Sequence, residues 1–246
     1  MPSLPIVTGL IRRRLLINYR IDPWVVAPLL PEGFRPKLHA GHAIGGICLI
    51  RLEDIRPRML PVWAGITSEN VAHRIAVLCE DEDGIEREGV FIPRRDTSSL
   101  ANHLAGGRVF PGEHHLADFI VCDDSGIIEI KARARDGGMS VSLSASETAA
   151  FPASSCFRSL EESSGFFETG GVGYSSTKDG CHLDAMRLET YEWKVRPLAV
   201  TKVSSSYFDN PAIFPAGSAV LDHALIMRDV PHEWHSMESH RVAVPA

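Results

Sequence analysis

The stretch Ile128–Ser146, IEIKARARDGGMSVSLSAS, decides the fold class. In its first half isoleucine and alanine alternate with charged residues, and in its second half apolar residues alternate with serines. Alternation with a period of two is typical of a strand with one buried face. The Asp-Gly-Gly sequence between the halves supplies residues that tolerate the positive φ of a tight turn. The stretch therefore predicts a β-hairpin.

Further alternating or apolar runs on both sides of this hairpin predict more strands, at 14–20, 43–50, 71–79, 89–92, 119–122, 191–195 and 200–205. The run 43–50 is apolar on both faces and is expected at the centre of a sheet, where Gly45 and Gly46 predict a bulge or a close backbone approach. Short helices are expected at 23–30 after Asp22, at 99–105 and at 155–163. The fold class is therefore mainly β (α+β), a closed or strongly curved antiparallel β-barrel with a few short flanking helices.

The composition favours an ordinary globular protein. The chain has 246 residues, a net charge of −6, and neither a repeat nor a linker, so a single domain spanning 1–246 is expected. The negative charge gives no reason to expect nucleic acid or an anionic membrane as partner. No apolar run approaches the roughly 18 residues that span a bilayer. Five scattered cysteines without a CxxC pair, and no signal-peptide pattern, predict reduced thiols and a cytoplasmic location.

Four stretches, taken in order, resemble a known family. They are LLINYRIDPWVVAPLLPEG (Leu15–Gly33), GHAIGGICLI (Gly41–Ile50), TSENVAHRIAV (Thr67–Val77) and GGRVFPGEHHLADF (Gly106–Phe119). Together they resemble the YqjF-like branch of uncharacterised proteins in the acetoacetate-decarboxylase-like superfamily. The resemblance covers roughly residues 10–235, with a loose match over 154–182. It implies a cone-like antiparallel barrel with an interior pocket, and self-association into a homo-oligomer.

The chain departs from the decarboxylases at the position that matters most. In those enzymes Gly-Gly-Arg is followed by Pro-Lys-Lys-Leu, and one of the lysines forms the Schiff base. The matching segment here is PGEHHL (Pro111–Leu116), so that His114 and His115 stand where the lysines would be. An imidazole cannot form the imine that serves as electron sink. Schiff-base decarboxylation is therefore not expected, and no cofactor is expected either.

The candidate catalytic residues are Glu69, His114 and His115. Glu69 lies near the position where the resemblance places an assisting acidic residue. A histidine with a pKa near neutrality is a competent general acid or base. If the segment is extended, adjacent side chains point to opposite faces, so only one of His114 and His115 can face the pocket. The alternatives are two surface histidines and an edge-strand glutamate in water.

The candidate substrate-binding residues are Arg74, Arg20 and Tyr174. Either arginine can hold a carboxylate through paired hydrogen bonds, although an internal partner such as Glu69 would also account for Arg74. Tyr174 follows a glycine-rich segment that can cover a pocket mouth. The run Arg94-Arg95-Asp96 is interpreted as a solvated turn with its own ion pair.

The leading functional hypothesis is a cofactor-independent lyase or isomerase acting on a small oxo- or hydroxy-carboxylate. A non-catalytic small-molecule binding barrel is the alternative, since the lysine is missing. A third possibility is a metal-dependent variant that uses Glu69, His73 and one of His114 and His115. Their spacing is not a recognised metal signature.

Overall fold

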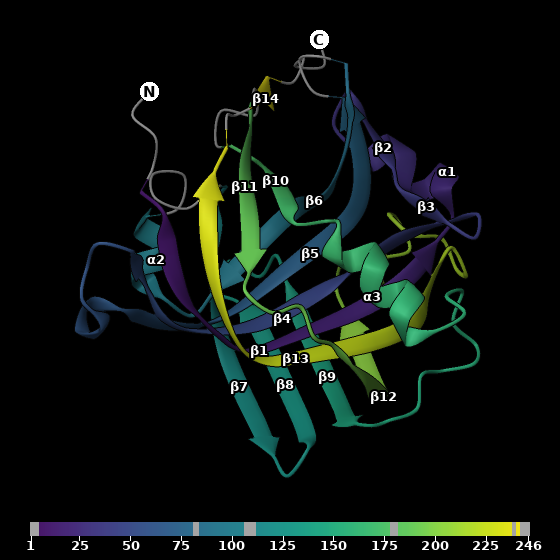
Figure 1. Ribbon diagram of the computed structural model, residues 1–246. Helices are drawn as coiled ribbons and strands as arrows, with labels where there is room; N and C mark the ends of the chain where they lie inside the picture. Colours follow the sequence, from purple (N-terminus) through teal and green to yellow (C-terminus); the bar gives the residue numbers. More distant parts are fainter. Residues whose placement is uncertain (1–4, 81–83, 106–111, 178–181, 238–239, 242–246) are drawn as a thin grey trace.

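One strongly curved β-sheet makes up most of the protein (Figure 1). The computed structural model describes residues 5–80, 84–105, 112–177, 182–237 and 240–241. Its strands are β1 (Val7–Ile21), β2 (Phe34–Pro36), β3 (Leu38–His39), β4 (His42–Pro57), β5 (Ile66–Glu80), β6 (Glu86–Thr97), β7 (His114–Asp124), β8 (Ile127–Ala134), β9 (Ser140–Glu147), β10 (Val172–Ser176), β11 (His182–Thr190), β12 (Arg196–Ser205), β13 (Ala219–Ser236) and β14 (His240–Arg241). The helices are α1 (Pro23–Val26), α2 (Leu100–Ala105) and α3 (Leu160–Glu168), with 3₁₀ turns η1 (Ala27–Leu29) and η2 (Val62–Ala64).

The sheet closes on itself in two places. The order β6-β7-β8-β9-β12-β13-β1-β4-β5 forms a ring because β5 also pairs with β6. A second ring forms through β10 and β11, because β10 pairs with β6 and β11 pairs with β13. The two rings share β13, β1, β4, β5 and β6. In Figure 1, β7, β8, β9 and β12 extend on one side of these shared strands, and β10, β11 and α3 lie on the other.

The shared strands are buried on both faces, which explains why their sequences are almost continuously apolar. On β1, Leu15 and Ile17 pack into the core of the first ring together with Ile130 of β8. Leu16 points the other way, into a second apolar cluster with Phe167 of α3. Each such side chain stabilises the fold by about 1.5–3 kcal/mol when it is fully buried.

The mid-chain hairpin and the central strand are confirmed. β8 and β9 pair antiparallel from Ile127 to Arg133, and β4 lies between β1 and β5. Strand pairing runs without interruption through Gly45 and Gly46, so there is no bulge there. The backbones instead approach closely, since a Cβ on Gly46 would lie 2.4 Å from the carbonyl oxygen of Ile17.

Four details differ from expectation. The expected strand 191–195 is not formed, and β12 begins at Arg196. The third helix begins after Ser159, whose side chain accepts a hydrogen bond from the Glu162 amide, and not at residue 155. Ser159 and Glu162 have the spacing of a capping box, which was the stronger start signal. The sheet is not wholly antiparallel, because β6 pairs parallel with both β7 and β10. The run 94–96 is part of β6 and not a turn. Within the described residues, every helix is too short or too polar to cross a membrane.

Replacing Gly46 with alanine should destabilise the protein. The new methyl group would meet backbone atoms, which cannot move as a flexible side chain can, and overpacking of this kind costs about 1–3 kcal/mol. The matched control is Gly165→Ala in α3, where a Cβ meets nothing within 4 Å. That change should stabilise by about 0.5–1 kcal/mol. The free energy of unfolding of both variants can be measured by urea denaturation. Equal effects of the two substitutions would contradict the close approach of the β1 and β4 backbones at Gly46.

Candidate functional site

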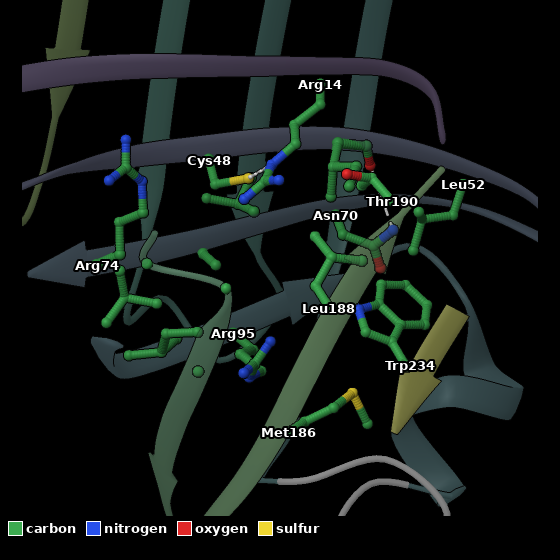
Figure 2. Close-up of a pocket in the computed structure, with 18 of the residues that line it drawn as sticks. Arg14, Cys48, Leu52, Asn70, Arg74, Arg95, Met186, Leu188, Thr190 and Trp234 are labelled. Atoms are coloured by element: carbon green, nitrogen blue, oxygen red, sulfur yellow. Dashed lines mark hydrogen bonds between the residues drawn. The ribbon is translucent and has the colours of Figure 1, made fainter. Parts of the chain in front are cut away.

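A cavity of about 180 Å³ lies inside the second ring. Its wall includes Arg14 from β1, Cys48 from β4, Arg74 from β5, Arg95 from β6, Met186 from β11 and Trp234 from β13 (Figure 2). Trp193 and Phe167 add further aromatic surface. Since one water needs about 10–15 Å³ of such volume, the cavity has room for a ligand of roughly ten non-hydrogen atoms.

Three arginines give this cavity its chemical character. The Arg14 Nε–H donates to Cys48 Sγ at 3.4 Å, and the Arg95 Nε–H donates to Ser175 Oγ at 3.0 Å. Burial lowers the pKa of both Arg74 and Arg95 to about 10, which leaves them charged at neutral pH. Within the part of the chain that the structure describes, none of the three lies within 4.0 Å of a carboxylate oxygen. A buried charge without a counter-ion is costly, so this wall suits an anion.

Other arginines of the same protein show the contrast. Arg13 lies 2.7 Å from Glu69, Arg94 lies 2.9 Å from Asp96, and Arg228 lies 2.7 Å from Asp123. The cavity arginines therefore differ from these three, whose guanidinium groups each form an ion pair with a carboxylate.

A chain of buried hydrogen bonds orients Arg74. Its Nη2–H donates to Asn18 Oδ1, and Asn18 Nδ2 lies 3.0 Å from His223 Nε2. His223 Nδ1 lies 2.7 Å from Asp222 Oδ2. Because the Asn18 amide uses its oxygen for Arg74, its nitrogen donates to His223, whose Nε2 accepts while Nδ1–H donates to Asp222. Burial lowers the pKa of His223, in agreement with this neutral form.

The same histidine makes a serine–histidine–aspartate arrangement that does not reach the cavity. Ser163 Oγ lies 2.7 Å from His223 Nε2. Ser163 is fully buried, and neither it nor His223 lines the cavity wall. We assign this cluster to the support of Arg74 and of α3.

His114 lines the cavity, and His115 does not. The two neighbours alternate along β7, opposite Arg95 and Asp96 of β6. His114 Nδ1 lies 3.3 Å from the Gly112 carbonyl oxygen, so that Nδ1 carries the proton and Nε2 the lone pair. Burial, and then the charge of Arg95, lowers the pKa of His114 to about 3. His115 points away and lies 3.0 Å from Asp136.

Glu69 lies outside the cavity wall. Asn70, Ala72 and Arg74 line the cavity from one face of β5, and Glu69 is on the opposite face. Its carboxylate accepts hydrogen bonds from Arg13 at 2.7 Å and from Arg51 at 3.2 Å. The structure therefore does not bring Glu69 together with either histidine, and Arg74 has Asn18, not Glu69, as its internal partner.

Arg20 and Tyr174 also lie outside the cavity wall. Arg20 donates to Asp222 at 3.1 Å, so it is connected to Arg74 only through the chain of hydrogen bonds. Tyr174 is buried on the far face of β10, against Phe34. Gly173 is on the cavity face, where a Cβ would lie 3.4 Å from Arg95 Nη2, so its missing side chain makes room for that guanidinium.

Sequence reasoning missed Arg14, Arg95 and Cys48. For Arg14 and Cys48 a usable signal was present. The strands 14–20 and 43–50 are apolar on both faces, which places any polar residue on them inside the molecule. Arg95 carried no such signal, because the ion pair of its neighbour Arg94 suggested a solvated turn.

In the described residues no group of three or more His, Cys, Asp or Glu side chains is placed to hold a metal ion. The segment 106–111, part of the decarboxylase-like stretch, lies outside those residues.

Comparison with known proteins agrees with this geometry. A family model described as an uncharacterised conserved protein, DUF2071 (COG2071), matches residues 10–230. No curated protein matches the chain in sequence.

Among solved structures, acetoacetate decarboxylase from Legionella pneumophila matches with a TM-score of 0.58 and 11% identity, over 96% of this chain and 89% of that one. An acetoacetate decarboxylase-like enzyme from Sphingomonas wittichii matches with a TM-score of 0.57 and 13% identity, over 97% and 93%. The enduracididine biosynthesis enzyme MppR, complexed with the condensation product of pyruvate and imidazole 4-carboxaldehyde, matches with a TM-score of 0.50 and 10% identity, over 98% and 89%. At these identities the likeness concerns the fold.

Glu69→Gln should destabilise the protein strongly. The change leaves the buried Arg13 without its main counter-ion, and breaking a buried pair in this way costs about 3–5 kcal/mol. Glu32→Gln, at an exposed position, should stay within about 0.5 kcal/mol of the parent. The measurement is the free energy of unfolding in urea. A fully stable Glu69→Gln protein would contradict the structural role given to this carboxylate.

The protein should lose stability as the pH falls below 6.5. Burial lowers the pKa of His73 and His232 to about 4 and that of His114 to about 3, from an ordinary 6.5. Below pH 6.5 these histidines are protonated in the unfolded chain but stay neutral in the folded chain. Each of them therefore lowers the free energy of unfolding by ~1.4 kcal/mol per pH unit as the pH drops from 6.5 toward its folded pKa. Urea titrations from about pH 7 to about pH 5 give the slope. In His114→Gln the slope of the free energy of unfolding against pH should be smaller by the contribution of one histidine. An unchanged slope would contradict the burial of His114.

Proposed function

The chain belongs to DUF2071, a family of uncharacterised conserved proteins, and we propose that it binds a small oxo- or hydroxy-carboxylate in the cavity and acts on it as a cofactor-independent lyase or isomerase. One observation carries the proposal: Arg14, Arg74 and Arg95 line one enclosed space, and none of them forms an ion pair within 4.0 Å with a carboxylate of the described chain. The carboxylate of Asp184 acts on Arg95 only from farther away. A ligand carboxylate would supply the missing counter-charge.

The dimensions and the apolar wall limit the ligand further. The cavity accommodates roughly ten non-hydrogen atoms, and Met186, Leu188 and Trp234 offer an apolar surface to the part of the ligand away from its acid group. A guanidinium can hold a carboxylate through two parallel hydrogen bonds. MppR, a protein of similar fold, holds a product formed from pyruvate. This supports an oxo-acid as ligand class.

His114 is the group proposed to move a proton. Without a ligand its pKa of about 3 keeps the imidazole neutral but makes it a weak base, and the negative charge of a bound carboxylate would raise this pKa toward the range of an efficient general base. Its Nδ1–H is directed to the Gly112 carbonyl oxygen. Nε2 can therefore accept a proton from the carbon next to the ligand carbonyl. As that proton leaves, negative charge develops on the carbonyl oxygen, where the guanidinium of Arg95 next to His114 can stabilise it. Glu69 has no part in this step, because it faces the filled core.

The missing lysine supports a route without a Schiff base. Within the described residues no lysine lines the cavity. Lys37, which is nearby, lies 2.6 Å from Glu88 and 4.1 Å from the centre of the Phe166 ring. Proton transfer assisted by guanidinium groups needs no amine and no bound cofactor.

Hydrogen–deuterium exchange at the methyl group of pyruvate, followed by proton NMR in heavy water, tests the enzyme proposal. The protein should accelerate the exchange, and His114→Gln should reduce the enzyme-dependent rate by about 10²–10⁴-fold, the usual value of a general base. The matched control is His115→Gln, the neighbouring histidine on the opposite face, which should exchange at the parental rate. Equal loss in both variants would contradict the assignment.

Binding is tested separately by calorimetric titration with pyruvate and with its uncharged amide. Pyruvate should bind and the amide should bind far more weakly. Arg95→Gln should weaken pyruvate binding about 10–100-fold, the value of one hydrogen bond to a charged group, whereas the exposed Arg135→Gln should not. Binding without any exchange would favour the non-catalytic binding barrel, and no binding of any small carboxylate would refute both.

A further inference from the structure

Cys48 is a free thiol on the wall of the cavity. It lies on β4, paired with Leu16 on β1 and Ala72 on β5, and the residue is 7% exposed. Figure 2 shows its sulfur directed to the Arg14 guanidinium, and the two atoms Nε and Sγ are 3.4 Å apart. The proposed proton transfer makes no use of this group.

The sulfur of Cys48 lies among cationic groups. Reactive cysteines are typically found in electropositive surroundings of this kind. A donor N–H of Arg14 already points at the sulfur, and Arg74 and Arg95 lie on the same cavity wall. These cations would also attract any anionic electrophile that enters.

A second, independent feature indicates that a ligand belongs beside Cys48. Arg74 is only 4% exposed, lines the cavity, and has no hydrogen-bond partner for its Nε–H. An Nη1–H of Arg14 is likewise buried without an acceptor. Buried guanidinium donors are nearly always satisfied, so these point to an acceptor supplied by a ligand.

We propose that Cys48 is the nucleophile of this cavity and captures the carbonyl carbon of the bound oxo-carboxylate as a reversible hemithioketal. The ligand class rests on the proposed function; the nucleophile does not. The sulfur forms a bond to the carbonyl carbon, the π electrons of the C=O bond move to oxygen, and the thiol proton ends on that oxygen. The adduct has the atoms of thiol plus ligand, and the step needs neither oxidant nor cofactor.

The other described cysteines differ in ways that make them internal controls. Cys122 is exposed and is paired across β7 and β8 with Glu129. Cys79 is buried, with its sulfur 3.5 Å from the Tyr174 hydroxyl. Burial, and then Asp222, raises the pKa of Cys156 to about 12. Among the described cysteines, Cys48 is the one whose sulfur accepts a hydrogen bond from a guanidinium.

The first test is competitive alkylation of the full-length protein with iodoacetate and iodoacetamide, read out for each cysteine by peptide mass spectrometry. Cys48 should prefer the anionic iodoacetate by about 10-fold or more, since cations concentrate an anionic reagent by such factors. Cys122, next to carboxylates, should prefer the neutral iodoacetamide. Arg14→Gln should reduce the preference at Cys48, and Arg14→Lys, which keeps the charge, should retain most of it. A Cys48 that reacts with neither reagent, or with the same preference as Cys122, overturns the proposal.

The second test uses pyruvate labelled with carbon-13 at its carbonyl carbon. Addition to the parent protein should give a protein-bound signal of a carbon with four single bonds, distinct from that of free pyruvate hydrate, and Cys48→Ser should not. If Cys48 prefers iodoacetate but pyruvate gives no such carbon signal, the proposed covalent capture of the oxo-carboxylate is overturned.

Pyruvate should still raise the melting temperature of Cys48→Ser, because the arginines are intact, and this separates the two proposals. If pyruvate binds to both proteins and neither the signal nor the iodoacetate preference is seen, the nucleophile is refuted and carboxylate binding stands. If no carboxylate binds to either protein while Cys48 keeps its iodoacetate preference, the proposed function is refuted and the nucleophile stands.

Discussion

The structure depends on the burial of its shared strands on both faces. β1, β4 and β5 lie between an apolar core on one side and the cavity on the other, so every second residue belongs to a different interior. On β5, Ile75 faces the core and Arg74 faces the cavity. A polar residue that is buried on these strands must find a partner inside the protein or in a ligand. This constraint decides which charges of the chain are structural and which belong to the site.

Two groups of arginines illustrate that division. On the core side, Arg13 is fully buried against Glu69, and this pair connects to Arg51 and Asp123 at the end of the first ring. On the cavity side, Arg14 follows directly in sequence but faces a cysteine and a tryptophan, and no carboxylate of the described residues lies within 4.0 Å of it. The alternation of a single strand thus places one arginine in a neutralised network and the next at an unneutralised wall. Nothing but the direction of the side chain distinguishes the two.

The same alternation of side chains determines which features of the fold and of the site could be predicted from the sequence. The hairpin, the central strand and the curved sheet followed from periodicity, and the family resemblance was confirmed by a family model that covers most of the chain. The separation of Glu69 from Arg74 was also visible, because they are five residues apart on one strand and hence on opposite faces. Which face enclosed a cavity could not be predicted, since both faces are apolar. The choice between His114 and His115 was undetermined for a related reason: it depends on the parallel pairing of β6 and β7, a long-range contact that periodicity does not encode.

In the proposed chemistry, Cys48 takes the role of nucleophile in a cavity without a lysine on its described wall. The cavity of this chain lies inside the second ring, and any shared strand can deliver a side chain to it. His114 enters from β7, where a lysine is expected from the resemblance, whereas Cys48 enters from β4 and is adjacent to β1 and its Arg14. An amine must be partly deprotonated to attack a carbonyl, which neighbouring cations favour; the same cations favour a thiolate. The electrostatic requirement of the site is thus met by either nucleophile, so a wall of three arginines is compatible with the loss of lysine and the use of a thiol on another strand.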